Sequence, residues 1–257
     1  PVLTSTTAME MENLPASLLV VGGGFIGCEL AQMFARAGVA VTLITRSRLL
    51  PQAEPEIGEA LAGVFNEEGL TVIGGAAYRV IRRTPMGVAL TVDVAGRVET
   101  IAAERILIAA GRRPNTSDLG LEDVGVTLAA DGAVKVDEHM RTSRPGTYAA
   151  GDVTGRDQFV YMAAYGAKIA AENAIKGDTR AYDATAMPWV VFTDPQAAGV
   201  GLTEAEARAQ GLDVRTSTLD LAHVPRALAA RDTRGLIKLV AEKGTDRLLG
   251  AHVLAPE

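Results

Sequence analysis

A glycine-rich loop that follows an apolar segment constrains the fold of this chain more than any other feature. Three glycines, Gly22, Gly24 and Gly27, have the GxGxxG spacing. After a strand and at the start of a helix, the first glycine makes a tight turn, the second lets the backbone approach a pyrophosphate, and the third allows close packing. The alternative is an ordinary glycine-rich turn. We expect a dinucleotide to bind along the loop Gly22, Gly23, Gly24, Phe25, Ile26 and Gly27.

The segments around this loop supply the context that the motif needs. Residues 17–21 form a short apolar run typical of a buried parallel strand. Residues 29–37 have helical spacing of apolar side chains and end at Gly38, a frequent C-cap. Residues 39–45 read as a second buried strand. This strand–helix–strand unit of about 30 residues predicts an α/β fold with a Rossmann-like domain.

The expected secondary structure of the rest of the chain changes at a polar linker, with mostly strands after it. Expected elements are a helix at 54–68, a strand at 70–73, an antiparallel meander at 78–83, 88–94 and 98–101, and a buried strand at 105–109. Short extended pieces at 135–136 and 147–149 precede a long helix at 159–176. After a polar linker at 178–186, strands are expected at 189–193, 199–201, 214–221, 236–240 and 248–254, with one helix at 204–210 that opens with a capping box. These elements predict a second, α+β domain.

Composition limits the binding partners and the cellular compartment that we expect for the protein. The 257 residues carry a formal net charge of −6 and no long basic run, which argues against nucleic-acid binding. No apolar run approaches the roughly 20 residues of a membrane span, so we expect no membrane association. The single cysteine, Cys28, excludes an internal disulfide and favours a cytoplasmic setting. We expect Cys28 to pack as a small buried hydrophobic side chain.

The end of the second strand distinguishes between the two nicotinamide cofactors. NAD sites usually carry an acidic residue there, about 20 residues after the loop, for the ribose 2′-hydroxyl. This chain has Thr45-Arg46-Ser47-Arg48 instead, with no acidic residue before Glu54. Guanidinium groups offer charged donors in a fork, so Arg46 and Arg48 favour a 2′-phosphate and therefore NADPH. The alternative is a solvated loop without a ligand.

Two further motifs resemble segments of the pyridine nucleotide–disulfide oxidoreductases, a family of flavoenzymes. The sequence IAAGRRPN at 108–115 resembles their ATGRxPN segment, and TYAAGDV at 147–153 resembles their second FAD motif. The resemblance covers essentially the whole chain. It implies an NADPH-binding domain at 1–141 with its core at 16–115, a returning segment of the FAD-binding domain at 142–181, and a truncated interface domain at 182–257. Family members form homodimers through this last domain.

The resemblance also implies roles for individual residues of the NADPH site. Phe25 matches an aromatic residue that gates the flavin, and Glu29 matches an acid near the nicotinamide carboxamide. By itself, a carboxylate in the first turn of a helix is favoured by the helix dipole alone. Arg46 matches the basic residue that contacts the 2′-phosphate. Val80 lies near the adenine side, and Gly111 offers its backbone to the cofactor.

For FAD, the resemblance implies that a carboxylate bonds the ribitol and that a helix begins at the flavin. Asp152 matches the carboxylate, although taken alone it would be a turn residue after Gly151. A helix N-terminus at the pyrimidine edge would stabilise negative charge on the reduced ring. The residues at this helix start are Gln158, Phe159, Val160 and Tyr161.

Segments 158–161, 187–195 and 224–235 resemble the branch of the family that reduces mercuric ions. There, a hydride passes from NADPH to FAD, and electrons then reach a cysteine pair and Hg(II), a soft ion held by thiolates. This sequence lacks the cysteine pairs and the first FAD glycine loop, so we expect a C-terminal fragment that is inactive alone. Two alternatives stay open. One is a dihydrolipoamide dehydrogenase-like or other disulfide reductase with a thiol or disulfide substrate, and the other is a non-catalytic nucleotide-binding and dimerisation module.

Overall fold

The computed structural model describes residues 1–256, which fall into two compact units. The first unit combines Pro1–Gly111 with the segment from Met187 onward, and the second is Arg112–Ala186. The domain boundary expected at residue 141 therefore lies inside the second unit, whereas the one expected near 182 lies close to a unit boundary. Within residues 1–256, none of the helices has the length and apolar character needed to cross a bilayer.

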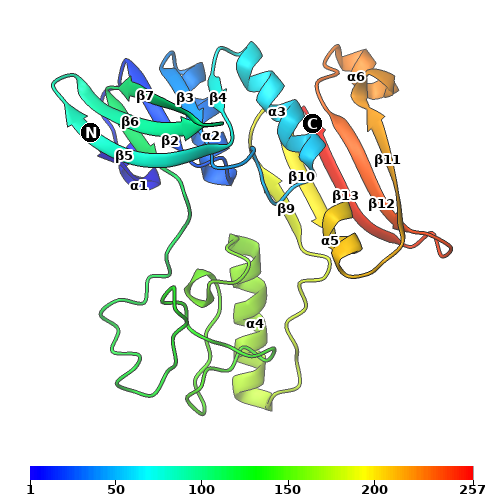
Figure 1. Ribbon diagram of the computed structural model, residues 1–257. Coiled ribbons are helices and arrows are strands. Elements are labelled where there is room, and N and C mark those ends of the chain that lie inside the picture. Colours follow the sequence, from blue (N-terminus) through cyan, green and yellow to red (C-terminus); the bar gives the residue numbers. More distant parts are fainter. Residues whose placement is uncertain (257) are drawn as a thin grey trace. The chain divides into compact units, whose positions relative to one another are not determined.

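A five-stranded parallel sheet forms the first layer of the first unit (Figure 1). Its order is β1-β8-β2-β3-β4, so β2 has β3 on one side and β8 on the other. The strands are β1 (Val2–Leu3), β8 (Arg105–Ile108), β2 (Ser17–Val21), β3 (Ala40–Ile44) and β4 (Thr71–Ile73). The Rossmann-like α/β fold expected from the glycine loop is confirmed. The short helix α1 (Ser5–Met9) and strand β1 were not expected, because neither has a periodic pattern.

Helix α2 (Phe25–Arg36) connects β2 to β3, and helix α3 (Pro55–Glu67) connects β3 to β4. Each has a buried face, which includes Phe34 in α2 and Phe65 in α3. The helix α2 begins at Phe25, four positions before the expected start at residue 29, because the glycines of the loop hide the helical pattern of the first turn. Cys28 is fully buried in α2, as expected, and burial raises the pKa of its thiol.

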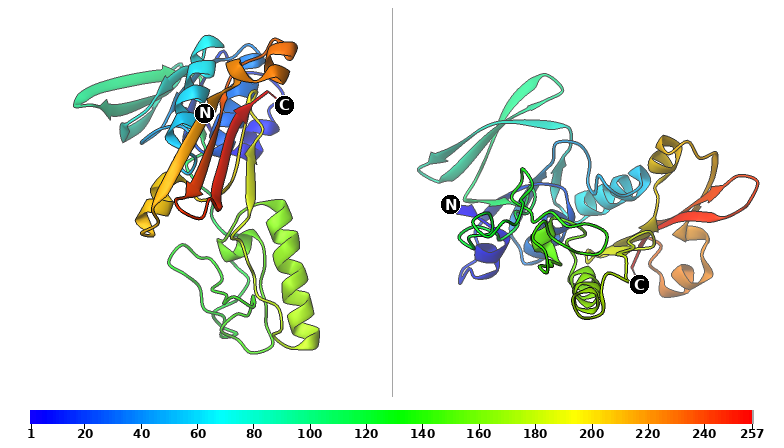
Figure 2. Two further views of the ribbon diagram at one scale, coloured as in Figure 1. Left: turned by 90° about the vertical axis from the view of Figure 1, so that its right-hand side faces the viewer. Right: turned by 90° about the horizontal axis from the view of Figure 1, so that it is seen from below.

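An antiparallel meander packs against the parallel sheet. Its three strands are β5 (Ala76–Thr84), β6 (Gly87–Val94) and β7 (Arg97–Ala103), in that order. Buried residues of both sheets form one apolar cluster, which includes Leu19 and Ile106 of the parallel sheet and Leu90 and Val92 of β6. Figure 2 shows the β5–β6 hairpin projecting away from the parallel sheet. The meander expected from the sequence is confirmed.

The C-terminal part of the first unit is a five-stranded antiparallel sheet of order β11-β12-β13-β10-β9. Its strands are β9 (Pro188–Val191), β10 (Gln196–Gly201), β11 (Val214–Asp220), β12 (Leu236–Glu242) and β13 (Leu248–Ala255). The capping box of α5 (Glu204–Ala209) is confirmed by reciprocal bonds of Thr203 and Glu206. A second helix, α6 (Pro225–Ala230), contradicts the expectation of a single helix, because this short helix has neither a periodic signal nor a side-chain cap like that of α5.

The second unit contains one long helix, α4 (Val160–Lys176), and the short 3₁₀ helix η1 (Asp152–Thr154). The side of α4 that includes Ile169 and Ala170 packs with Met140. Of the extended pieces expected at 135–136 and 147–149, the second contains Tyr148, which forms an isolated bridge, and neither belongs to a sheet. Two isolated bridges occur in the described part of this region, Leu128 with Val134 and Arg141 with Tyr148.

Candidate functional site

The glycine loop joins the carboxyl end of β2 to α2, where the order of the parallel sheet reverses direction. Ligands of open α/β sheets bind at such a point. Gly22 has a φ of +120°, and a Cβ at this position would overlap the carbonyl oxygen of Ala109. A Cβ at Gly27 would overlap the carbonyl oxygen of Gly22. Both positions therefore require glycine, one for the turn and one for the packing of helix on strand.

Gly24 lies in a different environment from Gly22 and Gly27. Its backbone is extended, with φ −82° and ψ −171°, and it is the N-cap of α2. Apart from its chain neighbours, no atom of residues 1–256 lies within 4 Å of a Cβ built on Gly24. The first amides of a helix have no intrahelical acceptor and carry the positive end of the helix dipole. The open space beside these amides leaves room for an anionic group such as a pyrophosphate.

Arg46 and Arg48 follow β3 but have opposite surroundings. The guanidinium of Arg48 donates hydrogen bonds of 2.7–3.5 Å to four carbonyl oxygens, those of Leu49, Leu50, Pro51 and Ala53. It therefore holds the segment after β3 in place. Arg46 is exposed and pairs with no carboxylate among residues 1–256, and its guanidinium carbon lies 5.4 Å from the ring centroid of Tyr78. The two arginines, which were given the same role from the sequence, therefore differ in their contacts.

Strand β9 contacts the first two turns of α2. The ring of Phe25 stacks on that of Trp189, with centroids 5.5 Å apart and an interplanar angle of 29°. The backbone N–H of Phe192 donates to Oε1 of Glu29 at 2.8 Å. Glu29 is the fifth residue of α2, so its expected place in the first helical turn is wrong. Its carboxylate accepts a hydrogen bond from the backbone amide of a segment distant in the sequence.

Val80 and Gly111 lie on segments that flank the loop and Arg46. Val80 belongs to β5, where the register shifts between Tyr78 and Val80, and its side chain is 38% exposed. Gly111 follows β8 with a φ of +134°. Two residues before it, Ala109 donates its N–H to Val21 and contacts Gly22. The structure thus brings the segment before Gly111 to the glycine loop.

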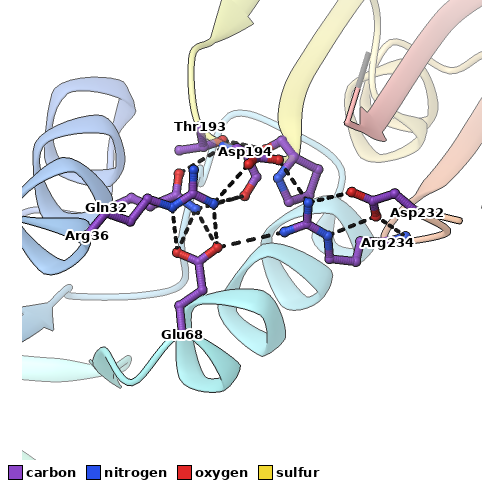
Figure 3. Close-up of polar contacts among 8 residues, drawn as sticks. Gln32, Arg36, Glu68, Thr193, Asp194, Asp232 and Arg234 are labelled. Atoms are coloured by element: carbon purple, nitrogen blue, oxygen red, sulfur yellow. Dashed lines mark hydrogen bonds and ion pairs between the residues drawn. The ribbon is translucent and has the colours of Figure 1, made fainter. Parts of the chain in front are cut away.

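A polar network connects α2 and α3 with the C-terminal sheet (Figure 3). Buried Gln32 donates to the Asp194 carbonyl at 2.7 Å and accepts from its N–H at 2.8 Å. Arg36 binds Glu68 through two hydrogen bonds of 2.6 and 3.0 Å, and Arg234 pairs with Asp194 at 2.9 Å. Hydrogen bonding to Arg36 lowers the pKa of Glu68, although burial opposes this effect. The network fixes the position of β9, which carries the contacts to Phe25 and Glu29.

A second polar cluster surrounds the buried side chain of Lys238 on β12. Its Nζ lies 3.0 Å from Glu54, 2.8 Å from Glu56 and 3.2 Å from Glu204. Lys238 is 3% exposed and Glu54 is 1% exposed. Burial by itself would lower the pKa of Lys238, but hydrogen bonds to Glu56, Glu54 and Glu204 outweigh it and raise this pKa. Glu54 also accepts from the N–H of Glu204, so the cluster links α3 to α5 and β12.

The residues expected at FAD lie together in the second unit. Asp152 is the first residue of η1, and its carboxylate lies 3.5 Å from the guanidinium of Arg112, which belongs to the IAAGRRPN segment at 108–115. Both side chains are about half exposed, at 45% and 51%. Helix α4 begins just beyond, at the 84% exposed Val160, and the rings of Phe159 and Tyr161 stack with centroids 5.3 Å apart. The segment at this helix start is Gln158, Phe159, Val160 and Tyr161.

Sequence reasoning missed Trp189, Phe192 and Lys238. Glu29 and Phe192 are 163 positions apart, and no local pattern indicates a hydrogen bond over that separation. Trp189 is the single tryptophan of the chain, and an aromatic residue at the start of a strand resembles ordinary core. Lys238 resembled a surface residue of a strand. The three glutamates around it come from two separate helices and could not be grouped from spacing alone.

Comparisons with known proteins agree with this geometry. Residues 1–171 match the family described as pyridine nucleotide-disulphide oxidoreductase, and residues 187–257 match the dimerisation domain of that family. The chain is 51% identical over 253 residues to a mercuric reductase of Streptomyces lividans, covering 98% of this chain and 53% of that protein. It is 44% identical to a mercuric reductase of Staphylococcus aureus, covering 98% of this chain and 46% of that protein.

Solved structures give the same result. The HOCl-induced flavoprotein disulfide reductase RclA from Escherichia coli superimposes with a TM-score of 0.87 at 34% identity, covering 100% of this chain and 58% of that one. The chain spans about half the length of the curated relatives that it matches. The resemblance to mercuric reductases that was expected from the sequence is confirmed. The chain belongs to the pyridine nucleotide-disulphide oxidoreductases, a family of oxidoreductase enzymes.

Proposed function

We propose that the glycine loop and Arg46 bind NADPH. The observation that carries this proposal is the exposed guanidinium of Arg46, which pairs with no carboxylate among residues 1–256. Arg46 follows β3, the strand next to the one that leads into the loop. The N–H groups at the start of α2 would bind the pyrophosphate in the open space at Gly24. Arg46 would bind the 2′-phosphate through charged donors. Arg48 would act indirectly, by holding the segment after β3.

The nicotinamide would lie beside Phe25 and Glu29. Trp189 keeps the ring of Phe25 in one orientation, and the Phe192 amide holds the carboxylate of Glu29. A carboxylate held in this way is a fixed hydrogen-bond acceptor for the carboxamide N–H₂ group. Both side chains therefore position the cofactor. Val80 would contact the adenine side, and Gly111 would offer its backbone.

The second unit would hold part of FAD. The Asp152 carboxylate suits the ribitol hydroxyls, and the N-terminus of the 17-residue helix α4 suits a ring that gains negative charge on reduction. The first turn of α4 contains no acidic residue that would oppose that charge. When bound, FAD would supply the acceptor for the hydride of NADPH.

We further propose that the intact protein reduces Hg(II). The support is the group of relatives named mercuric reductase, which are 41–51% identical over nearly the whole chain. The balanced reaction is NADPH + Hg(II) → NADP⁺ + H⁺ + Hg(0). Buried Cys28 is unsuited to bind Hg(II), since burial disfavours its thiolate. The thiol pair that delivers the electrons would come from outside this sequence. Homodimer formation through the dimerisation domain and a cytoplasmic setting are part of the same proposal.

Hg(II)-dependent oxidation of NADPH tests this activity. The intact protein that contains this chain should consume NADPH when HgCl₂ and excess thiol are both present, and should consume little when HgCl₂ is omitted. The loss of NADPH absorbance measures the rate. A protein that preferred oxidised lipoamide with NADH would contradict the proposal and would establish the dihydrolipoamide dehydrogenase-like alternative. A preference for another disulfide with NADPH would keep the cofactor assignment and replace the substrate.

A further inference from the structure

Tyr78 is fixed on β5 beside the end of β3. Its hydroxyl donates to the carbonyl oxygen of Ile44, the last residue of β3, at 3.0 Å. The half-buried ring packs against the apolar cluster between the meander and the parallel sheet. Burial raises the pKa of its hydroxyl while the charge of Arg46 opposes this, so the hydroxyl stays protonated and keeps its bond to Ile44. Both the apolar packing of the ring and the hydrogen bond of its hydroxyl therefore hold Tyr78 in place.

The Tyr78 ring is the one partner that the structure gives to the charged end of Arg46 within residues 1–256. The guanidinium carbon lies 5.4 Å from the ring centroid, within the range of a cation–π interaction. An aromatic face attracts the cation without using its N–H donors, in contrast to the carbonyl oxygens that occupy Arg48. The donors of Arg46 thus stay available while its side chain loses freedom. A long, exposed arginine would otherwise lose that freedom on binding.

We propose that Tyr78 is a positioning residue that increases the preference for NADPH over NADH by holding Arg46 ready for the 2′-phosphate. The inference rests on the proposed NADPH site and adds a residue that contacts Arg46 from a different sheet. The register of β5 against β6 shifts directly after the tyrosine, between Tyr78 and Val80.

Two variants of the full 257-residue chain separate the ring from the hydroxyl. Tyr78→Leu removes the aromatic face, and Tyr78→Phe keeps it. Isothermal titration with NADPH and with NADH gives the dissociation constants. For Tyr78→Leu, we expect NADPH binding to weaken about fivefold, the size of a partly exposed cation–π contact. NADH binding should change less than about twofold, since NADH has no 2′-phosphate for Arg46 to bind. Tyr78→Phe should retain the affinity of the unmodified chain for NADPH.

The NADH titration shows whether the effect is specific. If Tyr78→Leu weakened both cofactors equally, Tyr78 would have only a structural role, and the inference would be overturned. Unchanged NADPH affinity in Tyr78→Leu would overturn it as well. If the unmodified chain bound NADPH and NADH equally, the proposed function would fail, and the inference would fail with it. If the unmodified chain preferred NADPH and Tyr78→Leu left the ratio of the two dissociation constants unchanged, only the inference would fail.

Discussion

Replacing Lys238 with methionine should lower the free energy of unfolding of the first unit by about 3–5 kcal/mol, the usual cost of removing one partner from a buried ion pair. The substitution preserves most of the side-chain volume and removes the ammonium group. The carboxylate of Glu54, which is 1% exposed, would then lose its cation. Glu56 and Glu204 would lose the same partner. The cluster links α3 to the C-terminal sheet, so the loss should affect the whole unit.

Urea unfolding followed by the fluorescence of Trp189 measures this effect, because the single tryptophan lies in the first unit. Lys243→Met is the matched control. Lys243 pairs with Asp213 at 2.9 Å, but the two side chains are 55% and 71% exposed. Such a surface pair contributes about 0–1 kcal/mol. If Lys238→Met cost no more than Lys243→Met, the cluster would not stabilise the unit.

Gly24→Ala should weaken NADPH binding roughly 10- to 100-fold without destabilising the fold. The extended backbone of Gly24 accepts alanine, and the new methyl group meets open space within the chain. In the complex, that space would hold the pyrophosphate. Displacing the pyrophosphate would lose a hydrogen bond to a charged group, worth about 1.5–3 kcal/mol. Calorimetric titration gives the affinity, and the urea midpoint gives the stability.

Gly63→Ala is the control for this substitution. Gly63 lies inside α3, and apart from the helix's own neighbouring backbone no atom of residues 1–256 lies within 4 Å of a Cβ built there. Alanine in a helix interior is favoured over glycine by roughly 0.5–1 kcal/mol, so this variant should be at least as stable as the unmodified chain. Its NADPH affinity should not change. Full NADPH affinity in Gly24→Ala would show that the pyrophosphate binds elsewhere.

The local parts of the fold could be predicted from the sequence. The βαβ unit around Gly22–Gly27, the meander and the capping box at Thr203 all depend on residues close together in the chain, where periodicity and turn chemistry act. The start of α2 was misplaced because its first turn, from Phe25, contains Gly27 and follows Gly24. Helix α6 was missed because it is as short as α5 but lacks the capping box that indicated α5.

The contacts that hold the site could not be predicted. On β12, Lys238 is 3% exposed while Leu239 is 40% exposed, the reverse of what hydrophobicity alone would indicate. The three carboxylates around Lys238 explain this, and they come from other elements of the fold. Similarly, charge alone grouped Arg46 with Arg48. The positions of the carbonyl oxygens show that the donors of Arg48 are used within the segment after β3. Arg46 contacts the ring of Tyr78 instead.

The central claim, an NADPH site that uses Arg46 for the 2′-phosphate, is tested most directly by titrating NADPH and NADH into the unmodified chain and into Arg46→Glu. The control is Arg79→Glu, which reverses the charge of the residue after Tyr78 on β5, an arginine paired with Asp93 at 2.6 Å. We predict that Arg46→Glu weakens NADPH binding by at least about tenfold, from the loss of a charged hydrogen bond. NADH binding should change by less than about twofold, and Arg79→Glu should retain the preference for NADPH. An equal loss of both cofactors in Arg46→Glu would contradict the account.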